Sequence, residues 1–211
     1  MLICNDQRWV YIAIPRTATT SIRTVLRKRF PVWQPRKNMH DTIVPRSAAR
    51  FDVWYVVRNP YSRAVSMWQF ETMRGAAAVG YNWRGRLPPG GMDERYTPKQ
   101  WTAEAFGVWL RDVLDGQASQ NEQLQNMGAF LGPLLQRPAI VIRYESLAAD
   151  LQDKLDFWPA GLQLPVLNGT GHLRNDNWRQ FITPQTSELV RRWAGQDFER
   201  FGYSDVGCAN Q

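Results

Sequence analysis

Three short runs of apolar residues punctuate the chain, and each has the composition of a buried β-strand. They are Trp9–Ile14 (WVYIAI), Phe51–Val57 (FDVWYVV) and Ala139–Tyr144 (AIVIRY). Continuous runs of β-branched and aromatic residues at this length are typical of strands covered on both faces of a parallel sheet. The pattern therefore predicts three buried strands.

Helical spacing follows the first two runs. After the first run the apolar residues recur three or four positions apart, at Ile22, Val25, Leu26 and Phe30. After the second run, Asn59 suits the N-cap of a helix and Pro60 suits its first position. Each of these two strands is therefore expected to lead through a tight turn into a helix.

Further helices are predicted over residues 101–114 and 145–158, and from Pro184, which follows the cap residue Thr183. Strands that alternate with helices indicate an α/β fold, here a single domain over residues 1–211 built as a three-layer sandwich around a mainly parallel sheet. Residues 75–100 are rich in Gly, Pro and Arg and predict a long surface loop, either a lid or binding loop or a disordered segment.

Composition narrows the partners. The net charge of +7 and the pI of about 9.8 favour anionic ligands such as nucleotides, sulfated or phosphorylated compounds, nucleic acid or an acidic membrane. Cys4 and Cys208 stand far apart, so neither a disulfide framework nor a metal-ligand spacing is expected. No apolar run approaches the roughly 20 residues of a membrane span, and no signal peptide is evident. We expect a cytoplasmic protein.

The stretch IPRTATTS (residues 14–21) has the layout of a phosphate-binding turn without its glycines. Thr19, Thr20 and Ser21 occupy the first turn of the expected helix, where backbone N–H groups and the helix dipole attract anions. Arg16 adds a planar positive charge. The alternative is that a threonine, Thr17 or Thr19, merely caps the helix. The Walker pattern G-x-x-x-x-G-K-[ST] is absent, which argues against an ordinary ATP or GTP hydrolase.

A second positive turn follows the second strand. Arg58 stands at the end of that strand, and Ser62 and Ser66 lie on one side of the helix that follows. The alternative for Arg58 alone is an ordinary surface arginine that forms a salt bridge. Because ligands bind at the carboxyl ends of parallel strands, two such turns suggest a ligand with two separated anionic groups.

Both turns resemble motifs of the sulfotransferases that use 3′-phosphoadenosine 5′-phosphosulfate (PAPS). IAIPRTATTSIRTVL is similar to the 5′-phosphosulfate loop, and VVRNPYSRAVSMW is similar to the 3′-phosphate motif R-[ND]-P-x-x-R-x-x-S. The segments VIRYESLAADL and WRQFITPQTSELVRRWAGQDFERFGY resemble later parts of the family, with the carbohydrate-type and bacterial subgroups closest. Residues 75–135 match least.

The resemblance implies roles for particular residues. Arg58 and Ser66 match the pair that grips the 3′-phosphate, and no metal is required. The loop residues that match the 5′-phosphosulfate site are Arg16, Thr17, Ala18, Thr19, Thr20 and Ser21. Arg16 replaces the family's lysine, which leaves its part in leaving-group stabilisation open, and Ala18 replaces a frequent glycine.

Sulfuryl transfer also needs a base for the acceptor hydroxyl. His40 lies between the two motifs, where several carbohydrate sulfotransferases place a catalytic histidine, so the resemblance favours it. His172 is the competing histidine, and Glu71 and Glu94 are possible because glutamate serves in other subgroups. Acceptor binding is expected from the lid, at Tyr81, Trp83, Arg84 and Arg86.

The sequence thus predicts an enzyme that transfers a sulfuryl group from PAPS to a hydroxyl, or less readily an amine, of a carbohydrate or other polar acceptor, leaving adenosine 3′,5′-bisphosphate. One alternative is a nucleotide or small-molecule kinase of related P-loop-like architecture. The other is a non-catalytic basic module that binds anions or nucleic acid. No nucleic-acid-binding pattern appears, so that alternative rests on charge alone.

Overall fold

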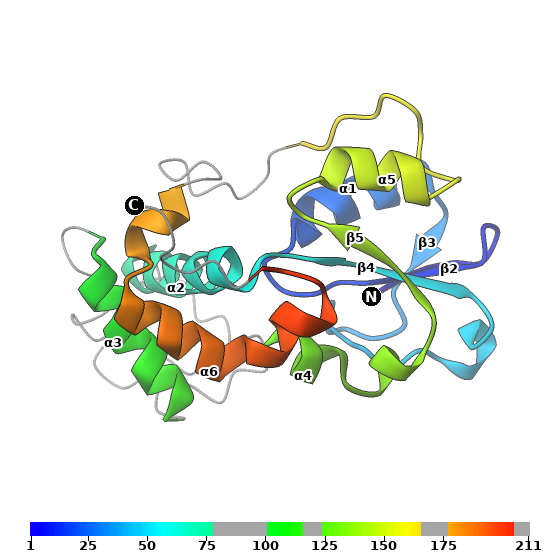
Figure 1. Cartoon of the computed structure of the whole chain (residues 1–211). Coiled ribbons are helices and arrows are strands. Elements are labelled where there is room, and N and C mark those ends of the chain that lie inside the picture. Colours follow the sequence, from blue (N-terminus) through cyan, green and yellow to red (C-terminus); the bar gives the residue numbers. More distant parts are fainter. Residues whose placement is uncertain (78–100, 116–123, 166–176, 205–211) are drawn as a thin grey trace. The chain divides into compact units, whose positions relative to one another are not determined.

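The structure is a computed structural model that describes residues 1–77, 101–115, 124–165 and 177–204, except the side chains of residues 71–77. By internal packing the chain forms two compact units (Figure 1). No helix within these ranges is both long and apolar enough to cross a membrane.

The first unit comprises Met1–Asn59 and Gln125–Gly169 and contains a five-stranded mixed sheet in the order β3-β1-β2-β4-β5. The three strands that the sequence predicted, β2, β4 and β5, are parallel, and β5 lies at the edge of the sheet. Strand β1 runs antiparallel to both of its neighbours. The bounds are β1 Leu2–Cys4, β2 Trp9–Ile12, β3 Val32–Trp33, β4 Asp52–Val57 and β5 Ala139–Arg143.

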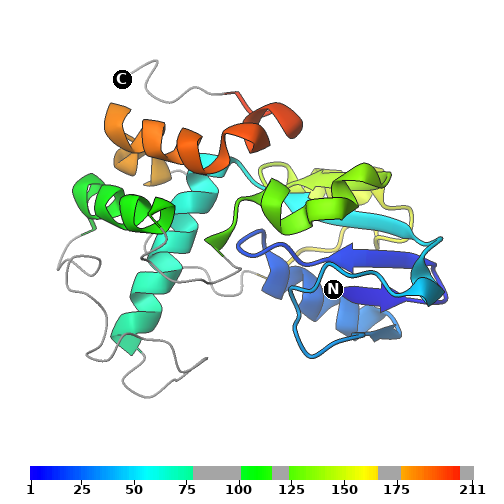
Figure 2. The same cartoon turned by 90° about the horizontal axis from the view of Figure 1, so that it is seen from below.

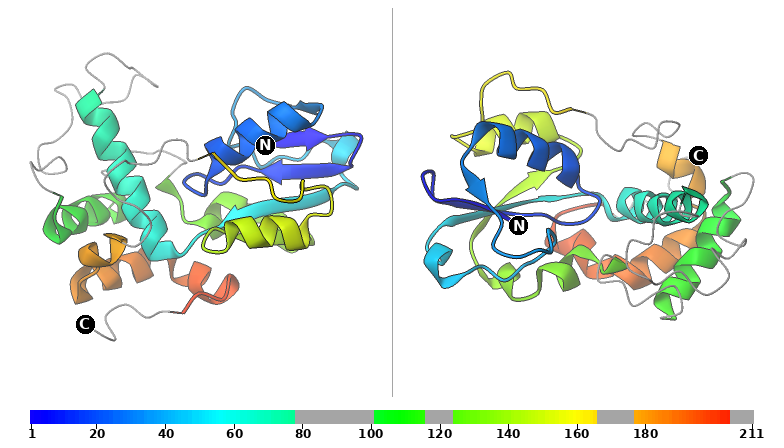
Figure 3. Two further views of the ribbon diagram at one scale, coloured as in Figure 1. Left: turned by 90° about the horizontal axis from the view of Figure 1, so that it is seen from above. Right: turned by 180° about the vertical axis from the view of Figure 1, so that it is seen from behind.

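Helices lie on both faces of this sheet (Figures 1 and 3). Helices α1 (Thr19–Arg29) and α5 (Leu147–Lys154) cover one face, where the apolar stripe of α1 packs with Trp9, Tyr11 and Trp54. The other face carries the short helix α4 (Met127–Leu131) and the 3-10 turn η3 (Gly132–Gln136), and the 3-10 turn η1 (Arg46–Ala48) precedes β4. The expected α/β class is confirmed.

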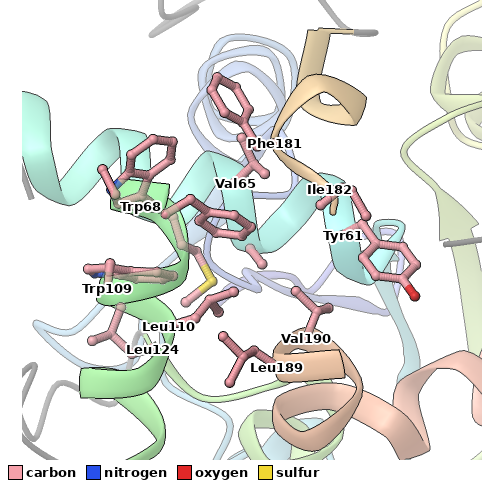
Figure 4. Packing of buried hydrophobic residues seen from close by; sticks show 14 of the residues in the cluster. Tyr61, Val65, Trp68, Trp109, Leu110, Leu124, Phe181, Ile182, Leu189 and Val190 are labelled. Atoms are coloured by element: carbon pink, nitrogen blue, oxygen red, sulfur yellow. The ribbon is translucent and has the colours of Figure 1, made fainter. Parts of the chain in front are cut away.

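The second unit comprises Pro60–Leu124 and Thr170–Gln211. Its described part is helical, with α3 packed along α6 and α2 in contact with both (Figure 2). The bounds are α2 Pro60–Ala77, α3 Ala103–Leu114, η4 Asn177–Phe181 and α6 Pro184–Arg200. Tyr61, Trp68, Trp109 and Val190 belong to its shared apolar cluster (Figure 4).

Local sequence signals explain where the helices begin. Thr102 caps α3 by accepting a hydrogen bond from the Ala105 N–H group. Thr183 and Thr186 form a capping box before α6, with Pro184 in its first turn as expected. Helix α2 begins at Pro60 as predicted but continues to Ala77, so residues 75–77 are helical rather than the start of a loop.

Candidate functional site

The turn between β2 and α1 takes a glycine-like path without glycine. Arg16 has φ 67° and Ala18 has φ 60°, both in the left-handed region. This conformation costs a residue with a Cβ about 1–2 kcal/mol. Ala18 (φ 60°, ψ 19°) is the N-cap of α1, and a left-handed residue followed by a right-handed one turns successive backbone N–H groups toward one point. The strained turn is therefore shaped like an anion-binding concavity.

The hydroxyl groups of Thr17 and Thr19 stabilise this turn. Thr17 Oγ1 and Thr19 Oγ1 both donate to the backbone carbonyl of Ile14, at 2.9 Å and 2.6 Å. Neither caps α1, since its N-cap has no side-chain hydrogen bond, and so the capping alternative is not what the structure contains. A hydroxyl has a single hydrogen. As arranged here, these two side chains hold the turn and offer a ligand acceptor capacity only.

The two other hydroxyls of the first turn of α1 differ in exposure. Thr20 is exposed and Ser21 is buried. The side chain of Arg16 is half-buried. The side chains of Arg16, Thr20 and Ser21, together with the backbone N–H groups of the turn, are the groups that could bind an anion.

The second positive turn meets the first one directly. Arg58, one residue beyond β4, donates from Nη1 to the carbonyl oxygen of Arg16 at 3.2 Å. Its guanidinium carbon lies 4.2 Å from the centre of the Tyr144 ring, a cation–π distance. The structure therefore brings Arg16 and Arg58 together, as their positions at the ends of adjacent parallel strands predicted.

The segment after β5 supports the Arg58 turn. Tyr144 N–H donates to the carbonyl of Val57 at 2.8 Å, which continues the strand pairing by one residue. The Glu145 carboxylate accepts a hydrogen bond from the backbone N–H of Asn59 at 2.7 Å. The resemblance of VIRYESLAADL to the family implied no role for either residue. Their place at the end of the strand beside β4 was the signal that could have assigned one.

Ser66 lies on α2, in the second unit, and is buried, as is its neighbour Ser62. Arg58 belongs to the first unit. The pairing of Ser66 with Arg58 stays a prediction of the sequence.

His40 contacts the backbone at the start of the turn between β2 and α1. Its Nδ1 lies 2.6 Å from the carbonyl oxygen of Ala13, and its backbone N–H donates to the Asn38 side chain. A carbonyl oxygen only accepts, so Nδ1 carries the hydrogen and Nε2 is the basic nitrogen of the neutral ring. Asp41 pairs with Arg36 at 3.1 Å and accepts from the N–H of Ile43.

The remaining candidates cannot be placed. Glu71 belongs to α2, but its side chain falls outside the described residues. Six other sites of interest lie outside the described residues altogether: His172, Glu94, Tyr81, Trp83, Arg84 and Arg86. Within the described part, no three His, Cys, Asp or Glu side chains cluster as metal ligands would.

The described site therefore consists of a strained turn, an arginine that reaches across to it, and a histidine with a fixed ring hydrogen. These groups can bind an oxyanion and accept a proton beside it. Comparisons of the chain with protein-family models, curated proteins and solved structures found no match.

Proposed function

We propose that this protein is a PAPS-dependent sulfotransferase. The observation that carries the proposal is the hydrogen bond from Arg58 to the Arg16 carbonyl, because it joins two anion-binding turns at the carboxyl ends of adjacent parallel strands. PAPS carries a phosphate at the 3′ position of its ribose and a phosphosulfate at the 5′ position. A site with two positively charged turns suits a ligand with two such anionic groups. The parallel strands β2, β4 and β5 support the finer proposal of a P-loop-like nucleotide-binding architecture.

The residues of the first turn would hold the 5′-phosphosulfate. The left-handed backbone at Arg16 and Ala18 directs N–H groups toward the ligand, and Arg16 adds a positive charge beside the leaving oxygen. Arg58 would hold the 3′-phosphate. Tyr144 and Glu145 would keep Arg58 and the Asn59 backbone in place through the contacts described above.

His40 is the proposed base. In the transfer step the acceptor oxygen bonds to sulfur, the bond from sulfur to the phosphate oxygen breaks, and the hydroxyl proton passes to His40 Nε2. The Nδ1 contact to Ala13 fixes the tautomer that this role requires. We propose a carbohydrate or another hydroxylated polar compound as the acceptor.

Calorimetry tests the donor site. We expect wild-type protein to bind adenosine 3′,5′-bisphosphate more tightly than adenosine 5′-monophosphate, which lacks the 3′-phosphate. In Arg58→Ala that preference should disappear while the residual affinity for the monophosphate remains. Absence of bisphosphate binding, or an unchanged preference in the variant, would overturn the proposal. ATP consumption that depends on Mg²⁺, without bisphosphate binding, would favour a kinase instead.

A matched pair of variants addresses the unusual arginine. Arg16→Lys introduces the residue that the sulfotransferase loop commonly carries, and Arg16→Gln keeps a polar, hydrogen-bonding side chain but removes the charge. If the charge of Arg16 assists departure of the phosphate oxygen, transfer should persist in the lysine variant and fall in the glutamine variant. Equal transfer in both variants would remove Arg16 from the catalytic role.

A further inference from the structure

Two arginines of α1 donate hydrogen bonds to the same neutral oxygen atom, which lies outside the turn between β2 and α1. Arg23 Nη2 and Arg27 Nη2 donate to Oε1 of Gln34, at 2.7 Å and 3.0 Å. They stand four residues apart and so lie on the same side of the helix. Arg23 is only 8% exposed, and its Nη1 is buried without a hydrogen-bond partner in the described part of the chain.

The charges at this point are poorly balanced. Burial, and then the neighbouring Arg27 guanidinium, lower the pKa of Arg23. Among the described residues, neither arginine forms an ion pair with a carboxylate, and Asp41, the nearest acid in sequence to Gln34, is paired with Arg36. Guanidinium groups normally meet carboxylate, sulfate or phosphate oxygens, with which they form their strongest hydrogen bonds. An amide oxygen satisfies their geometry but not their charge.

Gln34 also donates both hydrogens of its amide nitrogen. Its Nε2 donates to the carbonyl oxygens of Arg36 and Lys37, at 2.6 Å and 3.0 Å. These bonds hold Gln34 in place, with its oxygen between the two arginines. The side chain of Arg27 is exposed, so an anion can approach the pair from solvent.

We propose that Arg23 and Arg27 form a second oxyanion site, in which Gln34 Oε1 holds the position that an incoming carboxylate, sulfate or phosphate oxygen takes. This site goes beyond the proposed function and does not depend on PAPS. The same short segment runs on from Gln34 to His40. If the proposed function holds, an acidic group on the acceptor is one source of the oxyanion, and a free inorganic ion is the other.

The test is a titration of the full chain with sodium sulfate or sodium glucuronate, against sodium chloride at equal ionic strength. Thermal unfolding and backbone NMR shifts are followed in wild type, Arg27→Gln, Gln34→Glu and the matched control Lys28→Gln. Lys28 is the exposed neighbour of Arg27, and its replacement removes the same charge. Neither readout needs PAPS or transfer, so a failure here is distinct from a failure of the proposed function.

We expect sulfate to shift the resonances of residues 23–37 and to raise the Tm of wild type and Lys28→Gln. Arg27→Gln should weaken the apparent affinity about tenfold, as loss of one charged hydrogen bond does. Gln34→Glu should remove the response to sulfate, because the new carboxylate occupies the site. It also loses the two hydrogen bonds that Gln34 Nε2 donates to the Arg36 and Lys37 carbonyls, so the Tm without sulfate is not used as a criterion for this variant. A glucuronate response of the same pattern supports an acidic acceptor group, and a response to sulfate alone supports an inorganic ion.

Three results would overturn the proposal. Equal losses in Arg27→Gln and Lys28→Gln would show a general charge effect. Shifts confined to residues 16–21 would place the anion at the first turn instead. A sulfate response no larger than that of chloride would show that the arginine pair binds no oxyanion and that Gln34 is only a structural bridge.

Discussion

Arg58 Nη1 lies 3.2 Å from the backbone carbonyl oxygen of Arg16, a residue 42 positions earlier in the chain. The carbonyl belongs to a residue in the left-handed conformation. The guanidinium also lies against the ring of Tyr144, so one side chain links the ends of three parallel strands. The shapes of the two positive turns therefore depend on each other.

Replacing Arg58 with lysine should uncouple these turns. Lysine keeps the charge but cannot lie flat on Tyr144 and reach the Arg16 carbonyl at once. We expect the free energy of unfolding to fall by about 1 kcal/mol and the affinity for adenosine 3′,5′-bisphosphate to fall about tenfold, measured by urea unfolding and calorimetry. Arg46→Lys, at an exposed position of η1, is the control and should change neither quantity.

The strained turn makes a prediction about stability. Ala18→Gly removes the Cβ from a residue at φ 60°. The free energy of unfolding should therefore rise by about 1 kcal/mol and the Tm by about 2–4 °C. The matched control is Ala49→Gly, at φ −61°, where glycine should lower the Tm. A decrease of similar size in both variants, measured by calorimetric scanning, would contradict the assignment of strain to Ala18.

Glu145 should stabilise the backbone that follows Arg58. In Glu145→Ala the Asn59 N–H loses its acceptor, so its hydrogen exchange should quicken and the unfolding free energy should fall by about 1 kcal/mol. Glu145→Gln retains a carbonyl oxygen and should lose less. Asp153→Ala, an exposed acid on α5, serves as the control. Unchanged exchange of the Asn59 amide in Glu145→Ala would rule out this role.

The ring hydrogen of His40 can be observed directly. Nitrogen NMR of the neutral imidazole should show protonation at Nδ1, because that atom faces the Ala13 carbonyl. His172→Asn leaves a single histidine and so assigns the signal. His40→Asn places an amide nitrogen near the position of Nδ1, so it can still donate to the carbonyl but cannot accept the proton. We expect it to lower transfer by about 10²–10⁴-fold with bisphosphate affinity retained, whereas full transfer would exclude His40 as the base.

Asp150 makes part of the stability depend on pH. Burial acts to raise the pKa of this carboxyl, but hydrogen bonds from Lys154, the Arg143 N–H and Ser146 outweigh it, so its pKa is lowered. The folded state therefore holds this proton less tightly than the unfolded chain. The contribution is fully present above the unfolded pKa of about 3.9 and is lost as pH falls through the lower folded value. Asp150→Asn should flatten the decline of unfolding free energy below about pH 4, whereas Asp153→Asn should not.

The parts of the fold that the sequence predicted are those with a local physical cause. Apolar runs identified β2, β4 and β5, although β2 ends at Ile12 and the first apolar run continues to Ile14. Helical spacing identified α1, and Thr183 with Pro184 marked the start of α6. In contrast, the three residues of β1 and the two of β3 are too few to show an alternating pattern. Because these strands were missed, the antiparallel part of the sheet was missed as well.

The candidate site divides in the same way. Charge, hydroxyl residues and position after a strand are properties of the sequence, and they selected Arg16 and Arg58, whereas the family resemblance selected His40. Only the tertiary structure decided that Thr17 and Thr19 brace the turn, that Arg58 reaches the Arg16 carbonyl, and that Tyr144 and Glu145 support it. The threonine bonds to Ile14 are local, but they depend on the left-handed path of the turn. The contacts of Arg58, Tyr144 and Glu145 join segments far apart in the chain, and their geometry is set by how the strands pair, which no local pattern encodes.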